Sequence, residues 1–238
     1  MTEAKDKPKM VVLTGAGVSQ ESGISTFRDS DGLWENHDIM EVASPEGFRD
    51  NPELVLKFYN ARRNQLSSVE PNQAHHFLKE LEQCYDVTII TQNVDDLHER
   101  AGSSNIIHLH GELTKMRSVH DEEVTYPYDK DIAVGDLAPD GGQLRPHIVW
   151  FGEMVPAMDA ALEATRQADF FLVIGTSLQV YPAAGLVNYV PHGKPVVVVD
   201  PDDLSLPSSI HHIRMPATAA CAVLRKSLLS GQQESEEE

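Results

Sequence analysis

Cysteine is scarce in this chain. Only Cys84 and Cys221 occur among its 238 residues, and they lie far apart in the sequence. Two such cysteines can form neither a disulfide framework nor a metal site built from paired cysteines. We therefore expect the chain to work in a reducing, cytoplasmic setting.

Basic residues and long apolar runs are also few. The chain carries 19 lysines and arginines against 37 acidic residues, which gives a net charge of −18. Binding a double-stranded nucleic acid requires a basic footprint, so we expect no such partner. No apolar run reaches the ~18 residues of a membrane-spanning helix, and residues 1–9 lack the apolar core of a secretory signal. We expect no membrane association, a monomer, and a disordered acidic tail over 231–238.

Short apolar segments alternate with helical stretches along the chain. Buried strands are predicted at 9–13, 87–90, 106–109, 170–174 and 196–199. Helices are predicted at 18–22, 52–66, 72–83, 157–167, 182–190 and 216–229. Strands separated by helices indicate a single α/β domain over 1–238, with a Rossmann-like parallel sheet covered by helices on both faces. Insertions at about 35–70 and 114–145 are expected to form a smaller lobe, because the second is polar and lacks strong periodicity.

Glycines follow the first predicted strand. Gly15-Ala16-Gly17 and Ser19 stand where a helix begins, and such a turn lets backbone amides approach a phosphate. Gln20 occupies the last position of the dinucleotide fingerprint, where a glycine is usual. A tight turn without a ligand is the alternative interpretation.

Polar residues follow two further strands. Gln92, Asn93 and Asp95 could bind a ribose or a carboxamide, because ligands of open α/β sheets lie beyond the carboxyl ends of the strands. Gly175-Thr176-Ser177 could hold a ribose or a phosphate in the same way. Helix capping and ordinary turn formation explain these residues equally well.

His110 follows another strand and precedes a glycine. Histidine titrates near neutral pH, which suits it to proton transfer. Alternation along the strand would place His108 and His110 on the same face. A lone histidine is more often structural, so the sequence around it has to decide its role.

Five long motifs, in order, resemble the sirtuins. They are GAGVSQESGISTFRDSDGLW from Gly15, TQNVDDLHERAG from Thr91, HLHGEL from His108, RPHIVWFGE from Arg145 and IGTSLQVYPAAG from Ile174. The resemblance covers most of the chain, from about Lys9 to Gly193. It implies an NAD-dependent enzyme that removes acyl groups from lysine side chains of proteins.

The resemblance also implies roles for individual residues. His110 matches the catalytic histidine, and Asn93 belongs to the catalytic pocket. The substrate backbone and the acyl-lysine tunnel match Val149, Trp150, Phe151 and Gly152. The positions that match NAD-binding residues are Gly15, Ala16, Gly17, Ser19, Glu21, Phe27, Arg28, Trp34, Gln92, Asn93, Val94, Asp95, Gly175, Thr176, Ser177, Asp200 and Ala217.

The implied reaction transfers the acyl group to the ribose of NAD. The acyl oxygen attacks the ribose carbon as nicotinamide departs, and His110 accepts a proton from the ribose hydroxyls. The ribose oxygen then closes onto the acyl carbon, and water completes the reaction, so that the products are nicotinamide, O-acyl-ADP-ribose and free lysine.

A second pattern bears on the acyl group. Tyr59 and Arg62 are three residues apart on the predicted helix 52–66, so they share one face. Arginine can bind a carboxylate through two parallel hydrogen bonds, and a tyrosine hydroxyl can add a third donor. The pair resembles the Tyr-x-x-Arg signature of sirtuins that remove succinyl and malonyl groups. The alternative is that Arg62 pairs with a surface glutamate.

The chain departs from the family in two places. Most sirtuins carry two Cys-x-x-Cys pairs between the HG and RPH motifs, whereas 114–143 contains no cysteine. His120 with scattered carboxylates is a poor structural zinc site, so we predict no zinc. The lobe would then depend on packing of Val119, Val124, Tyr126, Tyr128, Ile132 and Leu137. Asp200 stands near the position of a family asparagine that contacts the adenosine ribose.

Three other functions use similar motifs. Mono-ADP-ribosyl transfer to proteins would use the same NAD pocket, but Tyr59 and Arg62 favour deacylation. A non-catalytic NAD-sensing module would not need His110 and Asn93. A nicotinamide oxidoreductase is disfavoured by Gln20 and by the absence of an early acidic residue for the ribose.

Overall fold

A six-stranded parallel sheet forms the larger part of the molecule, and it confirms the predicted fold class. The structure, a computed structural model, describes residues 7–24, 33–34 and 37–229. The strand order is β11-β10-β9-β1-β4-β5, and every pair of neighbours is parallel. The strands are β1 (Lys9–Thr14), β4 (Asp86–Thr91), β5 (Ile106–His108), β9 (Phe170–Ile174), β10 (Val196–Val199) and β11 (His211–Ile213).

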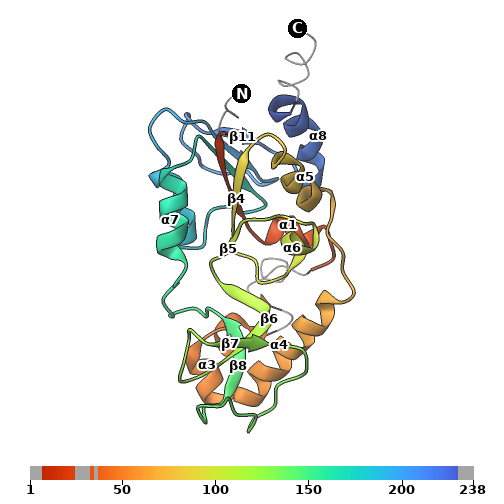
Figure 1. Cartoon of the computed structure of the whole chain (residues 1–238), viewed down its shortest axis with the longest axis vertical. Coiled ribbons are helices and arrows are strands. Elements are labelled where there is room, and N and C mark those ends of the chain that lie inside the picture. Colours follow the sequence, from red (N-terminus) through yellow and green to blue (C-terminus); the bar gives the residue numbers. More distant parts are fainter. Residues whose placement is uncertain (1–6, 25–32, 35–36, 230–238) are drawn as a thin grey trace, which may run out of the picture.

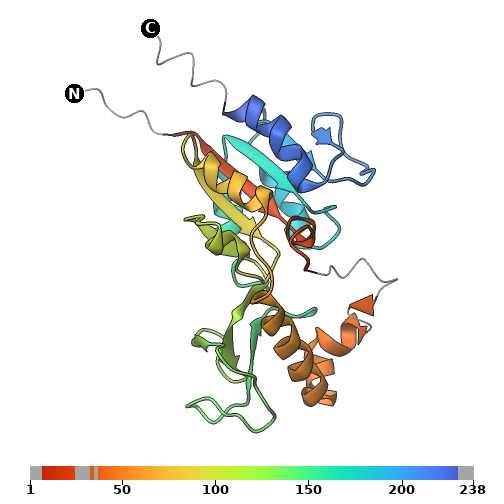
Figure 2. The same ribbon diagram turned by 90° about the vertical axis from the view of Figure 1, so that its right-hand side faces the viewer.

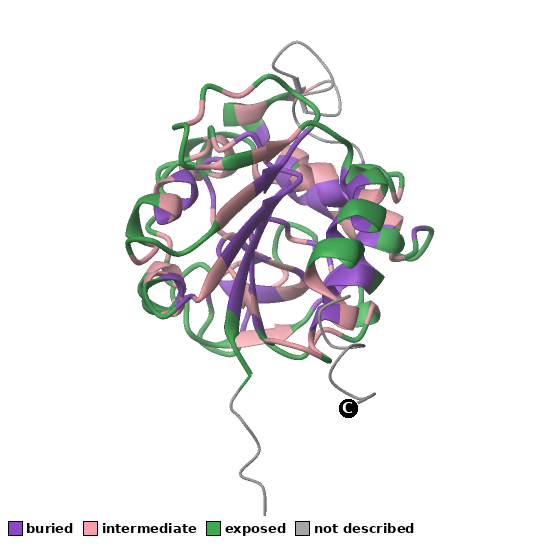
Figure 3. Cartoon of the chain, turned by 90° about the horizontal axis from the view of Figure 1, so that it is seen from above, coloured by how far each residue is buried: buried purple, intermediate pink, exposed green. Residues whose placement is uncertain are grey.

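Helices cover both faces of this sheet (Figures 1 and 2). Alternate residues of β1 point to opposite faces, so Met10 and Val12 enter one core while Val11 and Leu13 enter the other. On the first face lie α1 (Ala16–Gln20), α5 (Gln73–Leu81) and α8 (Ala217–Leu228), and on the second α7 (Met158–Arg166) and η1 (Ala183–Tyr189). Figure 3 shows the buried residues running along the central strands between the two helical layers.

The helix boundaries follow local sequence signals. Asn51 caps α4 (Pro52–Leu66), because its side chain accepts a hydrogen bond from the backbone N–H of Leu54 at 3.1 Å. Asn72 caps α5 in the same way through Ala74. The helix predicted at 182–190 is a 3₁₀ helix, η1, over Ala183–Tyr189. Among the described residues, no helix has the length and apolar character needed to cross a membrane.

A smaller lobe lies beyond one end of the parallel sheet, in the lower half of Figure 1. It contains a three-stranded antiparallel sheet in the order β7-β6-β8, which the sequence did not predict. The lobe comprises α2 (Ile39–Val42), α3 (Pro45–Asp50), α4, β6 (Gly111–Ser118), β7 (Thr125–Pro127) and β8 (Leu144–Ile148). A short hairpin of β2 (Leu33–Trp34) and β3 (His37–Asp38) precedes α2.

Packing in the outer part of this lobe differs from the expectation. Tyr128 and Ile132 are buried, and they pack with Leu56 of α4 and Met116 of β6. The expectation was wrong for three residues, because Val119, Val124 and Leu137 are 42%, 45% and 59% exposed. The apolar face of α4 closes this small core, so those loop residues remain at the surface.

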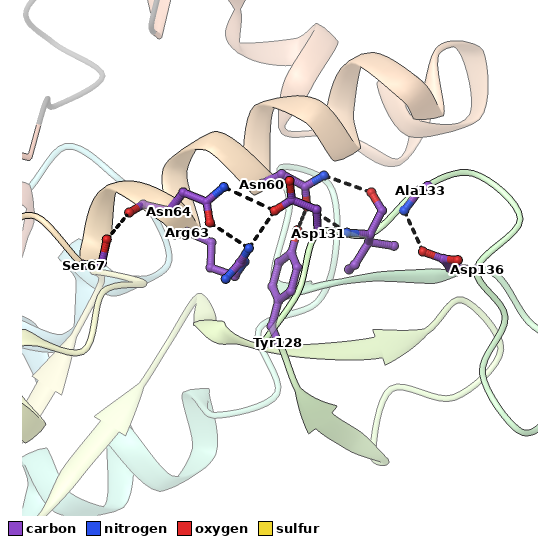
Figure 4. Close-up of polar contacts among 9 residues, drawn as sticks. Asn60, Arg63, Asn64, Ser67, Tyr128, Asp131, Ala133 and Asp136 are labelled. Atoms are coloured by element: carbon purple, nitrogen blue, oxygen red, sulfur yellow. Dashed lines mark hydrogen bonds and ion pairs between the residues drawn. The ribbon is translucent and has the colours of Figure 1, made fainter.

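Polar contacts join α4 to the segment that follows β7 (Figure 4). Asn60 donates through Nδ2 to the carbonyl of Ile132 at 2.9 Å and accepts from the N–H of Ile132 at 3.0 Å. The Tyr128 hydroxyl donates to the Asn60 carbonyl oxygen. Arg63 Nη2 lies 2.6 Å from Asp131 Oδ1. The small core is therefore tied to α4 by hydrogen bonds as well as by packing.

A hydrogen-bonded turn lies at the far end of β6, in the stretch where the sirtuins carry cysteines. Ser118 Oγ donates to Asp140 Oδ1 at 2.9 Å and accepts from the N–H of His120 at 3.1 Å. Asp140 Oδ1 also accepts from the N–H of Gly142 at 2.9 Å. The oxygen atoms of Ser118 and Asp140 do not fit a structural zinc ion, which prefers thiolates and imidazoles. Among the described residues, the one group that could supply three metal ligands lies elsewhere in the chain.

Candidate active site

A cavity of about 640 Å³ lies between the carboxyl edge of the parallel sheet and the small lobe. The ends of β1, β4, β9 and β10 line one wall, and α4 with the segment after β8 lines the other. Ligand pockets for small molecules usually measure about 300–1,000 Å³. The cavity is thus large enough for a cofactor-sized molecule.

Glycines allow close backbone contact at the end of β1. A Cβ atom on Gly15 would lie 2.6 Å from the Thr176 Cβ, which is too short for real atoms. Gly175 has a φ of +69°, and a Cβ there would lie 2.4 Å from the Val18 nitrogen. The N–H of Gly17 donates to the Gly175 carbonyl at 2.9 Å. The two turns pack directly against each other, and side chains would push this wall of the cavity apart.

Three polar side chains form a buried chain beside these turns. Asn93 Nδ2 donates to Ser19 Oγ at 2.9 Å, and Ser19 donates to the Asp95 carboxylate. Burial raises the pKa of Asp95, while the Ser19 hydrogen bond opposes that shift. All three residues are less than a tenth exposed. The Asn93 side chain is therefore held in place by its hydrogen bond to Ser19 of α1, and its backbone belongs to the turn after β4.

His110 lies on the same wall, next to Gln92. Its Nδ1 is 3.0 Å from the Gln92 carbonyl oxygen. Because a carbonyl can only accept, Nδ1 carries the proton, and Nε2 of the neutral ring keeps a free lone pair. Burial lowers the pKa of His110 below its ordinary 6.5, and the bond to Gln92 partly offsets that shift. The imidazole is thus held neutral, in the form that can accept a proton.

The end of the cavity beside α8 is also polar. Glu21 accepts hydrogen bonds from the backbone N–H of Thr218, at 3.0 Å, and from the Thr218 hydroxyl. Asp200, at the end of β10, accepts from the N–H of Asp202 at 3.0 Å. Both carboxylates line the cavity together with Ala217. They are placed to accept hydrogen bonds from hydroxyl groups of a ligand.

The opposite wall belongs to the lobe. Tyr59 and Arg62 project from α4, are buried, and line the cavity. The Arg62 Cζ lies 6.0 Å from the centroid of the Phe58 ring, within reach of a cation–π contact. Trp150 Nε1 donates to the Tyr59 hydroxyl oxygen at 3.1 Å. Arg62 is only 8% exposed, so it lies in the wall of the cavity and not on the open surface.

The structure brings most of the predicted site residues to this one cavity. Those that line it are Gly15, Ala16, Gly17, Ser19, Glu21, Tyr59, Arg62, Gln92, Asn93, Val94, Asp95, His110, Val149, Trp150, Phe151, Gly152, Gly175, Thr176, Asp200 and Ala217. Ser177 is buried behind the wall and does not line it. Phe27, Arg28 and the side chain of Trp34 lie outside the described residues.

His108 does not share the position of His110. The strand β5 ends at His108, so the alternation does not continue to His110. His108 Nε2 lies 2.6 Å from the Glu99 carboxylate, away from the cavity lining.

Several cavity residues were not singled out from the sequence. Apolar side chains of Ile24, Ile39, Leu113 and Val155 complete the walls. Their residue types are those of any core, so the sequence alone gave no signal for them. Val180, Tyr181 and Pro182 also line the cavity, and they fall within the motif that begins at Ile174.

Comparisons with known proteins agree on one family. A model of the Sir2 family matches residues 15–182. An NAD-dependent protein deacylase of Helicobacter pylori is 54% identical over 222 residues, covering 92% of this chain and 97% of that protein. One from Bacteroides thetaiotaomicron is 53% identical over 228 residues, with the same coverage.

Solved structures are similar over nearly the whole chain. A Sir2 homologue in complex with NAD has a TM-score of 0.84 and 39% identity, covering 94% of this chain and 91% of that one. A Sir2 variant with a deacetylated p53 peptide and 3′-O-acetyl ADP-ribose has a TM-score of 0.78 and 29% identity, covering 93% and 94%.

Proposed function

The chain belongs to the Sir2 family and is an NAD-dependent protein-lysine deacylase, and we propose that it removes acidic acyl groups at least as well as acetyl. The acidic groups are succinyl and malonyl, whose free carboxylate would meet Arg62 and Tyr59. The lysine of a substrate protein would enter from the side of Val149, Phe151 and Gly152.

The sheet wall is suited to NAD. The close packing at Gly15 and Gly175 brings two backbone turns together at the cavity, where backbone amides could bind a pyrophosphate. Gln92, Asn93 and Asp95 would face the nicotinamide and its ribose, and Glu21 with Asp200 the adenosine end. NAD, when bound, supplies the ribose whose carbon the acyl oxygen attacks and whose hydroxyl receives the acyl group.

His110 would act as the general base. His110 lines the cavity, and because the Gln92 carbonyl engages Nδ1, the lone pair of the neutral ring is on Nε2. It would accept a proton from a ribose hydroxyl, and that oxygen would then bond to the acyl carbon. The low pKa of His110 keeps the base neutral at physiological pH.

The acyl preference rests on one observation: Arg62 and Tyr59 lie side by side on the buried wall of α4 that faces the cavity. A guanidinium in this position would form charge-assisted hydrogen bonds with a carboxylate. Burial raises the pKa of Tyr59 far above its usual range, so its phenol stays protonated and can donate. An acetyl group has no carboxylate that either residue could bind.

The test compares three versions of one peptide, bearing acetyl-, malonyl- or succinyl-lysine. We expect desuccinylation with a kcat/KM no lower than that of deacetylation. Arg62→Met should reduce desuccinylation about 10- to 100-fold more than deacetylation, because a hydrogen bond to a charged group contributes about 1.5–3 kcal/mol. Arg63→Met is the matched control, since Arg63 bonds to Asp131 instead. Equal losses for acetyl and succinyl peptides would contradict the role of Arg62.

The same assay separates deacylation from the rival reaction. Mass analysis should find free lysine peptide, nicotinamide and O-acyl-ADP-ribose. A product in which ADP-ribose is attached to the protein would instead favour mono-ADP-ribosyl transfer.

We also propose that the lobe keeps its shape without zinc. The hydrogen bonds of Ser118 and Asp140, and those of Asn60 and Tyr128, support this proposal. Elemental analysis of the purified protein should find zinc well below one atom per chain.

A further inference from the structure

Trp150 is held by Glu153 and Arg145 in the wall of the cavity that also contains Tyr59 and Arg62. Its backbone N–H donates to Glu153 Oε2 at 2.8 Å. The Arg145 guanidinium lies over its ring, with Cζ 3.3 Å from the centroid. Arg145 in turn binds both Glu153 oxygens, at 2.6 and 3.1 Å. The indole is only 3% exposed, so its orientation is set by these neighbours.

The fixed indole directs its single donor at Tyr59. Trp150 Nε1 lies 3.1 Å from the Tyr59 hydroxyl oxygen, and both groups are buried. An indole N–H can only donate, so the phenol oxygen must accept this bond. The phenol proton is then directed away from the indole. The bond from Trp150 thereby excludes one direction in which the Tyr59 hydroxyl could otherwise donate.

We propose that Trp150 is a positioning residue for acyl specificity, which orients the Tyr59 hydroxyl as a donor to the carboxylate of an acidic acyl group. This inference rests on the proposed preference for such groups. Trp150 would act on the acyl group through Tyr59, and this role is distinct from forming the wall of the lysine tunnel. Arg145 and Glu153 contribute by fixing the indole.

Phenylalanine at this position separates the two roles. Trp150→Phe keeps an aromatic ring between Phe48 and Arg145 but removes the indole N–H. In the wild type, the Phe48 ring centroid lies 5.1 Å and the Arg145 Cζ 3.3 Å from the centroid of the Trp150 ring. The quantity to measure is the acyl selectivity, defined as kcat/KM for a succinyl peptide divided by kcat/KM for the matching acetyl peptide. Because both peptides meet the same enzyme sample, a partly unfolded variant cannot change this ratio.

The experiment is a double-mutant cycle of Trp150→Phe and Tyr59→Phe. In the wild-type background, Trp150→Phe should lower the acyl selectivity about fivefold, the effect of one hydrogen bond of ordinary strength. In the Tyr59→Phe background, where no hydroxyl is left to orient, the same change should leave the ratio within error.

Each outcome decides something. An unchanged ratio in the wild-type background, or an equal fall in both backgrounds, would overturn the positioning role while leaving the proposed function intact. A wild-type enzyme that removes acetyl but not succinyl or malonyl groups would overturn the proposed function, and the role of Trp150 with it.

Discussion

The two walls of the cavity are built in different ways. The sheet wall stands on large apolar cores on both faces of the parallel sheet. The lobe wall stands on α4, which packs on one side into a core that it shares with Leu113 and Trp150. On its other side, α4 is joined to the segment after β7 by four buried apolar residues and by side-chain hydrogen bonds. We infer that the rigid sheet wall carries the chemistry that every acyl group shares. On this inference the lobe wall carries the acyl selectivity, and changes in it should leave the shared reaction intact.

The largest expected effect falls on the sheet wall. His110→Ala removes the proposed general base, so kcat should fall about 10²- to 10⁴-fold for acetyl, malonyl and succinyl peptides alike. His211→Ala, at an exposed histidine of β11, is the control and should keep full activity. A His110→Ala loss restricted to one acyl group would contradict the division between the walls.

The pH profile sharpens the same prediction. The proposed base His110 can accept a proton only when neutral, so activity should be lost as pH falls through its pKa. Burial lowers that pKa from 6.5. The acidic limb of kcat/KM for an acetyl peptide should therefore lie below pH 6.5. A limb above that value would assign the titration to another group.

Stability should depend first on the sheet side. Phe77 of α5 is fully buried in the core under β1 and β4. Phe77→Ala should lower the free energy of unfolding by about 3–5 kcal/mol, as expected for a large side chain removed from a core. Its neighbour His76 is exposed, and His76→Ala should change stability by less than about 0.5 kcal/mol in the same urea titration.

This difference between the halves also explains what the sequence could reveal. Strands such as Phe170–Ile174 are continuous apolar runs, so their position and the parallel sheet follow from the pattern alone. The sheet wall of the cavity could be predicted because Gly15, Asn93 and His110 all follow predicted strands, and the ends of parallel strands meet at one edge. Their order along the chain then matched a known family.

The lobe could not be predicted in this way. Its sheet is made of short strands in polar sequence, and its core depends on partners distant in the chain, such as Asn60 with Ile132. Apolar residues such as Leu137 were expected inside and lie at the surface. The bond from Trp150 to Tyr59 likewise joins two motifs far apart, and no local pattern announces it.

A smaller and more local loss of stability is expected from the lobe network. Asn60→Ala removes three hydrogen bonds and should cost about 2 kcal/mol, because each contributes about 0.5–1.5 kcal/mol and some relaxation follows. Amide exchange should increase at 126–132 while β1 and β4 stay protected. The control is Asn64→Ala, one turn further along α4, because the hydrogen bond from Asn64 to Asp131 is exposed to solvent. Equal exchange throughout the chain would show that the halves unfold together.

The smallest effect concerns the turn formed by Ser118 and Asp140. Ser118→Ala removes the bond from its hydroxyl to Asp140 and its bond from the His120 N–H, at a cost of about 1 kcal/mol. A chelator should leave the melting temperature of the wild-type protein unchanged, whereas a zinc-dependent lobe would lose stability on the same treatment. Thermal melts of both proteins with and without the chelator make the comparison. A chelator-induced drop in the wild type would mean that metal, and not the Ser118 hydrogen bonds, stabilises this end of the lobe.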